Sequence, residues 1–185
     1  MGHRFEDFLA QHGRLSEGEF VARFTAPLLL SEGAAAGGTG RFAAGAEPTR
    51  KLEKLDGEGL AVTGSTPPPA APSSTEALFV VSIVRRAESK LAIVTVGRGD
   101  DCDLHLGHPL VSKRHAYFKQ EADAWTLSDA DSSNGTWVGG ERLEPHKPRK
   151  LADSDPIRFG PAVRYRFFLP ASFHAYMSYR ARIKK

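Results

Sequence analysis

At 185 residues the chain is long enough for one buried core of ordinary size with extensions, but too short for two full domains. Its formal net charge of +3, from 25 Lys and Arg against 22 Asp and Glu, is too small to predict nucleic-acid binding through a basic face. The single cysteine, Cys102, excludes an internal disulfide framework and agrees with a reducing compartment; we expect it to be a small core residue.

The first segment, residues 1–30, predicts two short amphipathic helices followed by a strand. Phenylalanine, leucine and valine recur there at spacings of three and four, with a break near Gly13. Ser16 followed by Glu19 is typical of a capping box, and the Pro-Leu-Leu-Leu run that starts at Pro27 is consistent with a short strand. We expect a helical hairpin on the flank of the main domain. A separate docking peptide for another protein is the alternative.

Residues 31–76 have a different composition, dominated by glycine, alanine, proline, serine and threonine. Such a segment cannot bury enough apolar surface to order itself, so we expect a flexible linker with a stiffer, proline-rich end. Its threonines are accessible candidates for phosphorylation. They are Thr39, Thr49, Thr63, Thr66 and Thr75.

The main domain, residues 77–170, alternates strand-like runs with turns. The runs are short and rich in β-branched and aromatic residues. They span 78–84, 91–96, 102–106, 115–120, 125–129, 136–138, 156–159 and 163–169. The first two, separated by a polar turn, predict a hairpin. Many short strands without helices between them predict an all-β domain in which two sheets pack as a β-sandwich.

Residues 171–185 predict a basic C-terminal helix. Ser172 is a suitable N-cap, and four positive charges lie near the end of the helix, where cations favour its dipole. The apolar side would carry Phe173, Tyr176, Met177, Tyr179 and Ile183. We expect this helix to dock on the domain. A membrane-surface or nucleic-acid tail is the alternative, which four charges support only weakly.

The sequence predicts a cytoplasmic protein without stable membrane association. It contains no apolar run of about 18 residues and begins without an apolar signal segment. Its alanine, glycine, arginine and proline content is typical of a GC-rich genome, which favours a bacterial source.

Three turn-like segments carry residues suited to binding an oxyanion. They are Gly97-Arg98-Gly99, the run 111–115 and the run 131–136. Each lies where a strand-like run meets a turn, so we expect all three to converge at one end of the sandwich. A guanidinium, a serine hydroxyl, an amide side chain and exposed backbone N–H groups together favour phosphate as the ligand.

The order of these motifs resembles the forkhead-associated (FHA) family over roughly residues 77–170. The matching motifs are Gly97-Arg98, Ser112 with His115, the run 133–136, and the run 155–160. The resemblance implies an FHA/SMAD-like sandwich that binds phosphothreonine peptides through loops at one end. It also implies a protein without enzymatic activity or cofactor.

By this resemblance, six residues would bind the phosphopeptide. They are Arg98, Ser112, Lys113, Arg114, Ser133 and Asn134. The arginine between two glycines would anchor the phosphate, the first serine would donate its hydroxyl, and the asparagine would hold the peptide backbone. Four further residues would support the site structurally. They are Gly97, His115, Gly135 and Thr136.

Two other chemistries are less consistent with the sequence. Ser112 and His115 lack the nucleophile elbow and oxyanion motif of a serine hydrolase, so we expect no catalytic residue. The run from Asp129 begins like a calcium loop, but its sixth position is Asn134 rather than glycine and its twelfth is Gly140 rather than glutamate. We therefore expect no metal.

The sequence thus favours a phosphothreonine-binding module in Ser/Thr kinase signalling. Its expected partner is a phosphothreonine-containing protein or peptide, either a Ser/Thr kinase or a kinase substrate, and not nucleic acid. The extra segments before and after the main domain leave an alternative, a phosphate-independent structural adaptor that uses the FHA fold in a secretion or signalling assembly.

Overall fold

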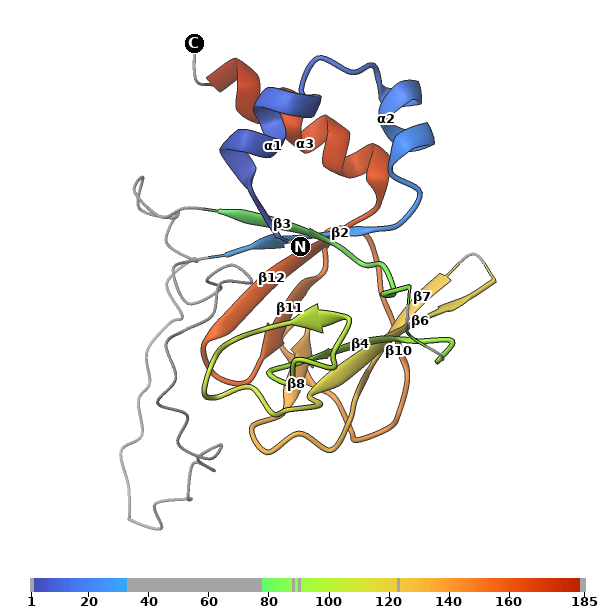
Figure 1. Cartoon of the computed structure of the whole chain (residues 1–185), viewed down its shortest axis with the longest axis vertical. Helices are drawn as coiled ribbons and strands as arrows, with labels where there is room; N and C mark the ends of the chain where they lie inside the picture. The colour runs from blue at the N-terminus through green and yellow to red at the C-terminus, as the bar shows by residue number, and fades with distance from the viewer. Residues whose placement is uncertain (1, 33–77, 88, 90, 123, 184–185) are drawn as a thin grey trace, which may run out of the picture.

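The structure, a computed structural model, describes residues 2–32 and 78–183 except 88, 90 and 123. It contains two β-sheets packed face to face, as predicted, and a layer of three helices at one end (Figure 1). Residues 33–76 of the expected linker, with all its candidate threonines, lie outside the described residues.

The seven-stranded sheet is antiparallel throughout and has the order β1-β3-β2-β12-β11-β8-β9. Its strands are β1 (His3–Arg4), β2 (Leu28–Ser31), β3 (Phe79–Ser82), β8 (Thr136–Val138), β9 (Glu141–Arg142), β11 (Pro156–Phe159) and β12 (Val163–Phe168). The five-stranded sheet has the order β10-β7-β6-β4-β5, with β4 and β5 parallel. Its strands are β4 (Val94–Gly97), β5 (Leu104–His105), β6 (Ala116–Glu121), β7 (Ala124–Asp129) and β10 (Arg149–Lys150).

The core between the sheets follows from the alternation along each strand. On β12, Val163, Tyr165 and Phe167 are buried in the core, whereas Arg164 and Arg166 point away from it. Because successive side chains of a strand point to opposite faces, this pattern fixes which face of β12 meets the other sheet. Each run that the sequence predicted as a strand contains or overlaps an observed strand.

The predicted hairpin between residues 78–84 and 91–96 is wrong. Strand β3 lies in the seven-stranded sheet and β4 in the five-stranded sheet. Strand β2, from the N-terminal segment, pairs with β3 instead and also with β12. All four residues of β2 are buried, because Leu29 faces the core of the sandwich while Leu28 and Leu30 face the helices.

A second, aromatic core lies between the helices and the outer face of the seven-stranded sheet. The helices are α1 (Phe5–His12), α2 (Glu17–Arg23) and α3 (Pro170–Ile183). The first two confirm the expected helices, and α2 begins at the predicted capping box of Ser16 and Glu19. Phe8, Phe20 and Phe173 are buried together in this core. The N-terminal segment therefore supplies two sheet strands, β1 and β2, and part of the covering layer. The division of the chain at residues 30 and 77 stays a prediction.

Helix α3 begins earlier than predicted. Its first residue is Pro170, so Ser172 lies in the first turn and is not the N-cap. Proline suits this position because the first turn leaves its backbone nitrogen without a helical partner. Phe173 and Met177 are buried as predicted, but Tyr179 and Ile183 are 62% exposed, so the apolar side is narrower than expected. No helix in the described part of the chain is long and apolar enough to span a membrane.

We expect Phe173→Ala to lower the free energy of unfolding by about 3–5 kcal/mol, because it leaves a cavity where the ring contacts Phe5 and Phe168. Tyr179→Ala, on the exposed side of the same helix, should change it by less than about 0.5 kcal/mol. Urea denaturation followed by circular dichroism measures both variants. Equal effects would contradict docking of α3 through this ring.

Candidate functional site

The turn after β4 is tied to the segment around Ser112 by backbone hydrogen bonds. The Arg98 N–H donates to the Ser112 carbonyl at 2.9 Å, and the Gly99 N–H donates to the Lys113 carbonyl at 2.9 Å. The guanidinium of Arg98 also donates from Nε to the Val111 carbonyl at 3.2 Å. The first two predicted turns therefore lie side by side, with the half-buried arginine lying along the second turn.

Glycine is required at position 97 by the closeness of these two turns. A Cβ atom there would lie 2.1 Å from the Lys113 carbonyl oxygen and 3.0 Å from that of Ser112. Neither neighbour is the end of a flexible side chain, so a larger residue would push the backbones apart. Gly97 thus sets the spacing on which the position of Arg98 depends.

The third turn meets the second through serine and asparagine side chains. The Ser133 N–H donates to Ser112 Oγ at 3.1 Å, and the two serine Oγ atoms are 3.5 Å apart. Asn134 donates from Nδ2 to the Leu110 carbonyl at 2.9 Å. The structure therefore brings Arg98, Ser112, Ser133 and Asn134 to neighbouring positions. Their role as ligands stays a prediction.

His115 is fully buried between the second and third turns. Its Nδ1 accepts a hydrogen bond from the Ser112 N–H at 3.0 Å, so the proton is on Nε2, which donates to the Gly135 carbonyl at 2.9 Å. Burial lowers the pKa of this imidazole, which favours the neutral ring that this pair of bonds requires. The edge-to-face contact with Phe159 fixes the plane of the ring.

The hydrolase alternative is not supported by this geometry. Both ring nitrogens of His115 are engaged with backbone groups, and the Ser112 hydroxyl contacts Ser133 instead. A general base must reach the hydroxyl proton that it removes. The imidazole therefore braces two turns, which is the role that the family resemblance implied.

Asp129, at the end of β7, organises the third turn and was missed as a functional residue by the sequence analysis. Its side chain is buried and accepts hydrogen bonds from the Ser132 N–H at 2.8 Å, from Ser132 Oγ at 2.7 Å and from Thr136 Oγ1. Ser132 Oγ in turn accepts from the Gly135 N–H at 2.9 Å. The signal in the sequence was an aspartate followed at three and seven residues by hydroxyl side chains.

The same network argues against calcium at Asp129, because both carboxylate oxygens are used within the turn. Within residues 2–32 and the described part of 78–183, no group of three or more His, Cys, Asp or Glu side chains is arranged to hold a metal ion.

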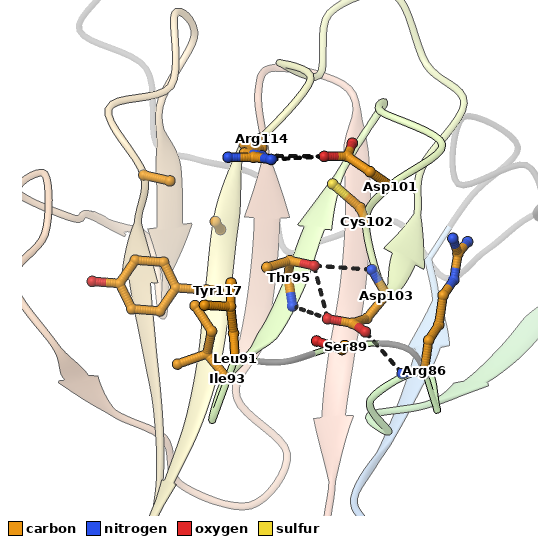
Figure 2. A pocket seen from close by; sticks show the side chains of 12 residues that line it. Arg86, Ser89, Leu91, Ile93, Thr95, Asp101, Cys102, Asp103, Arg114 and Tyr117 are labelled. Carbon is orange, nitrogen blue, oxygen red and sulfur yellow. Dashed lines mark hydrogen bonds and ion pairs between the residues drawn. The ribbon is translucent and has the colours of Figure 1, made fainter.

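Two of the predicted ligands are placed differently from the others. Lys113 is exposed, and only its carbonyl joins the turn network. Arg114 forms an ion pair with Asp101, with Nη2 2.8 Å from Oδ2 (Figure 2). Its side chain is 75% exposed, so this pair contributes little stability, and both residues line a neighbouring pocket.

That pocket has a volume of about 630 Å³ and lies against β4 and β6 (Figure 2). Asp103 braces its wall by accepting hydrogen bonds from the backbone N–H groups of Arg86 and Thr95 and from the Thr95 hydroxyl. Cys102 is buried beside it, as predicted, and burial raises the pKa of the thiol to about 11. The thiol therefore stays protonated and is a poor nucleophile.

We expect Gly97→Ala to lower the free energy of unfolding by about 1–3 kcal/mol, because its methyl group would overlap the Lys113 carbonyl. Gly18→Ala is the matched control. It adds the same methyl group inside α2, where nothing lies within 4 Å, and should raise stability by about 0.5–1 kcal/mol. Thermal or urea denaturation measures both; a neutral Gly97→Ala would contradict the close approach of the two turns.

Stability should fall as the pH falls below about 6.5. Burial lowers the pKa of His115 in the folded protein, so the unfolded chain takes up a proton near pH 6.5 that the folded state resists. Burial also lowers the pKa of His12 and His108, so both add to this loss of stability. Each such histidine changes the free energy of unfolding by at most about 1.4 kcal/mol per pH unit. Urea denaturation at pH 7.5 and 5.5 should show a smaller loss for His115→Gln than for the wild type. An equal loss in both would contradict the buried, neutral ring.

Comparison with known proteins relates part of this chain to a known family. Residues 94–160 match the model of the FHA domain. The chain is 38% identical over 74 residues to "FHA domain-containing protein PS1" of Arabidopsis thaliana and 43% identical over 72 residues to the E3 ubiquitin-protein ligase rnf8-B of Xenopus laevis. These alignments cover 39% and 36% of this chain, but only 5% and 14% of the two relatives.

Among solved structures, the chain is similar to one described as an analysis of phosphothreonine-dependent FHA domain interactions. That alignment has a TM-score of 0.40 and 27% identity, and covers 49% of this chain and 83% of the other. The N-terminal FHA domain of S. cerevisiae Rad53p in complex with a phosphothreonine peptide aligns with a TM-score of 0.43 and 24% identity, over 52% and 88% of the two chains. With the match to the family model, the two-sheet sandwich and the three ordered motifs on its turns, residues 94–160 form an FHA domain.

Proposed function

We propose that this FHA domain is a binding module for phosphothreonine peptides and that the phosphate binds where the three turns meet. The observation that carries the proposal is the meeting of Ser112 and Ser133 beside Arg98. These residues belong to separate turns, and together they offer a guanidinium and two hydroxyl groups to one small anion. A phosphate with three terminal oxygens suits such a set of donors.

The hydrogen bonds around Ser112 support donation to a phosphate. Its Oγ already accepts the Ser133 N–H, so its own proton is directed away from that bond. The contact between the two hydroxyl oxygens, at 3.5 Å, is at the limit of hydrogen bonding. Replacing this weak contact by a charge-assisted hydrogen bond to a phosphate oxygen would therefore stabilise the complex, because the bond that forms is stronger than the contact that is lost.

The predicted ligands contribute unequally in this proposal. Arg98 and Ser112 contact the phosphate, Ser133 adds a hydroxyl, and Asn134 positions the peptide backbone next to the phosphothreonine. Lys113 supplies a mobile positive charge at the rim. Arg114 contributes least, because its guanidinium would have to leave Asp101 to reach the ligand.

The same proposal covers the binding partner and the mode of action. The partner is a phosphothreonine-containing protein, either a Ser/Thr kinase or a kinase substrate, and the module acts by binding rather than by catalysis. A cytoplasmic location and a bacterial source stay predictions from the sequence.

The test is titration of a phosphothreonine peptide library against the wild type and Arg98→Ala. We expect selected peptides to bind the wild type, to lose binding without the phosphate, and to bind Arg98→Ala about 10- to 100-fold more weakly, since one charge-assisted hydrogen bond contributes about 1.5–3 kcal/mol. Lys119→Ala, which removes an exposed charge on β6, is the control and should bind like the wild type. Equal binding by Arg98→Ala and the wild type would instead favour the phosphate-independent adaptor.

A further inference from the structure

Four side chains line up across strands β9, β8, β11 and β12 on the outer face of the seven-stranded sheet. Arg142 pairs with Trp137, Trp137 pairs with Arg158, and Arg158 pairs with Arg164. Residues directly opposite each other on antiparallel strands lie on the same face. The buried neighbours on these strands face the core, so this group, which we call the arginine row, faces away from it.

Trp137 holds two of the arginine side chains in place. The guanidinium carbon of Arg158 lies 3.8 Å from the centre of the Trp137 ring, and that of Arg142 lies 5.6 Å from it. Such cation–π contacts hold a guanidinium against the ring while its N–H groups still point outward. A ligand that binds here would therefore lose less side-chain entropy than at mobile arginines.

No ion pair between described residues neutralises the positive charge of the row. Among the described residues, the ion pairs of arginine involve Arg114, Arg149 and Arg166, and none involves a member of the row. Arg158 and Arg164 are cross-strand neighbours with the same charge, and burial together with the positive charge of Arg164 lowers the pKa of Arg158. An anion placed between them would relieve the repulsion between these like charges.

The row begins at the candidate phosphate site. A Cβ atom at Gly135 would lie 2.6 Å from Arg142 Nε, and Gly135 directly follows Ser133 and Asn134 in the third turn. From there the row crosses three strand spacings, or about 14 Å, which an extended peptide covers with about four residues. The helices cover a different part of the same outer face, over β2 and β3, and leave β8 and β11 uncovered (Figure 1).

We propose that the arginine row binds an acidic stretch of the same ligand, a run of Asp or Glu residues that adjoins the phosphothreonine. This inference rests on the proposed function and adds a preference for ligand sequence to it. Carboxylates match the planar donor sets of the three guanidiniums, and the row lies in line with the phosphate site. Nucleic acid fits less well, because three charges are few for a polyphosphate and the Trp137 ring is already covered by Arg158.

The test compares three phosphothreonine peptides of equal length in fluorescence anisotropy titrations. One carries four glutamates on the N-terminal side of the phosphothreonine, one carries them on the C-terminal side, and one has glutamine at all these positions. We expect one of the glutamate peptides to bind the wild type about 5- to 20-fold more tightly than the glutamine peptide at low salt. This gain should shrink as salt is raised, because exposed charges are screened.

Two substitutions at Arg164 test whether the arginine row causes this gain in affinity. Arg164 is exposed, and its side chain forms no hydrogen bond or ion pair with another described residue, so Arg164→Gln and Arg164→Glu should fold normally. The first should reduce the gain and the second should abolish it, while affinity for the glutamine peptide stays within about twofold of the wild type. Arg14→Gln, at an exposed position in the turn between α1 and α2, removes the same charge and should keep the full gain.

The outcomes separate this inference from the proposed function. If the glutamine peptide binds in a phosphate-dependent manner but the glutamates add nothing, or if Arg14→Gln and Arg164→Glu lose the gain equally, the arginine row is not an acidic-peptide site and the phosphate site stands. If no phosphopeptide binds, both proposals fail. A single-stranded oligonucleotide that competes for the row with the same dependence on Arg164 would also overturn the choice of ligand.

Discussion

The arrangement of the site depends on one uncharged imidazole. His115 accepts a hydrogen bond from the Ser112 N–H and donates one to the Gly135 carbonyl, so a single side chain links the turn before β6 to the turn that connects β7 with β8. An amine or a carboxylate could not do this, because the position needs one acceptor and one donor on opposite sides of a rigid ring. Burial keeps the ring in that state. The order of the proposed binding surface therefore comes from an interior group that need not touch a ligand.

Around this link, the chain uses side chains in place of regular secondary structure. Asp129 holds the third turn through Ser132 and Thr136, and Gly97 lets the first turn approach the second within backbone contact. Asp129 thereby satisfies the buried N–H and hydroxyl of Ser132 and the hydroxyl of Thr136, and Gly97 leaves room for the backbone hydrogen bonds between the first two turns. The loops can thus be irregular, as the proposed binding surface for an extended peptide requires, without being loosely held.

The sequence predicted the sandwich because its strands carry alternating β-branched and aromatic residues, and it predicted the meeting of Arg98, Ser112 and Ser133 because each lies at the end of such a run. Strands β1, β9 and β10 have two residues each and are too short to show a period. The hairpin prediction failed because the partner of β3 comes from about 50 positions earlier in the chain, and pattern alone does not reveal long-range pairing. The Asp101 partner of Arg114 was missed for the same reason, since that contact is created only by the fold. Asp129 was missed although its signal is local, because the run that begins there was considered only as a calcium loop.

The end of strand β2 lies next to the start of strand β3. Strand β2 ends at Ser31, whose hydroxyl accepts a hydrogen bond from the Phe79 N–H at 2.7 Å, so the chain leaves the sheet and re-enters it at nearly the same point. An insertion or deletion between Ser31 and Phe79 would therefore leave the register of β2 against β3 unchanged. The junction is thus a natural place for evolution, or for an engineer, to graft a tether, a tag or another folded module without shifting one strand against the other.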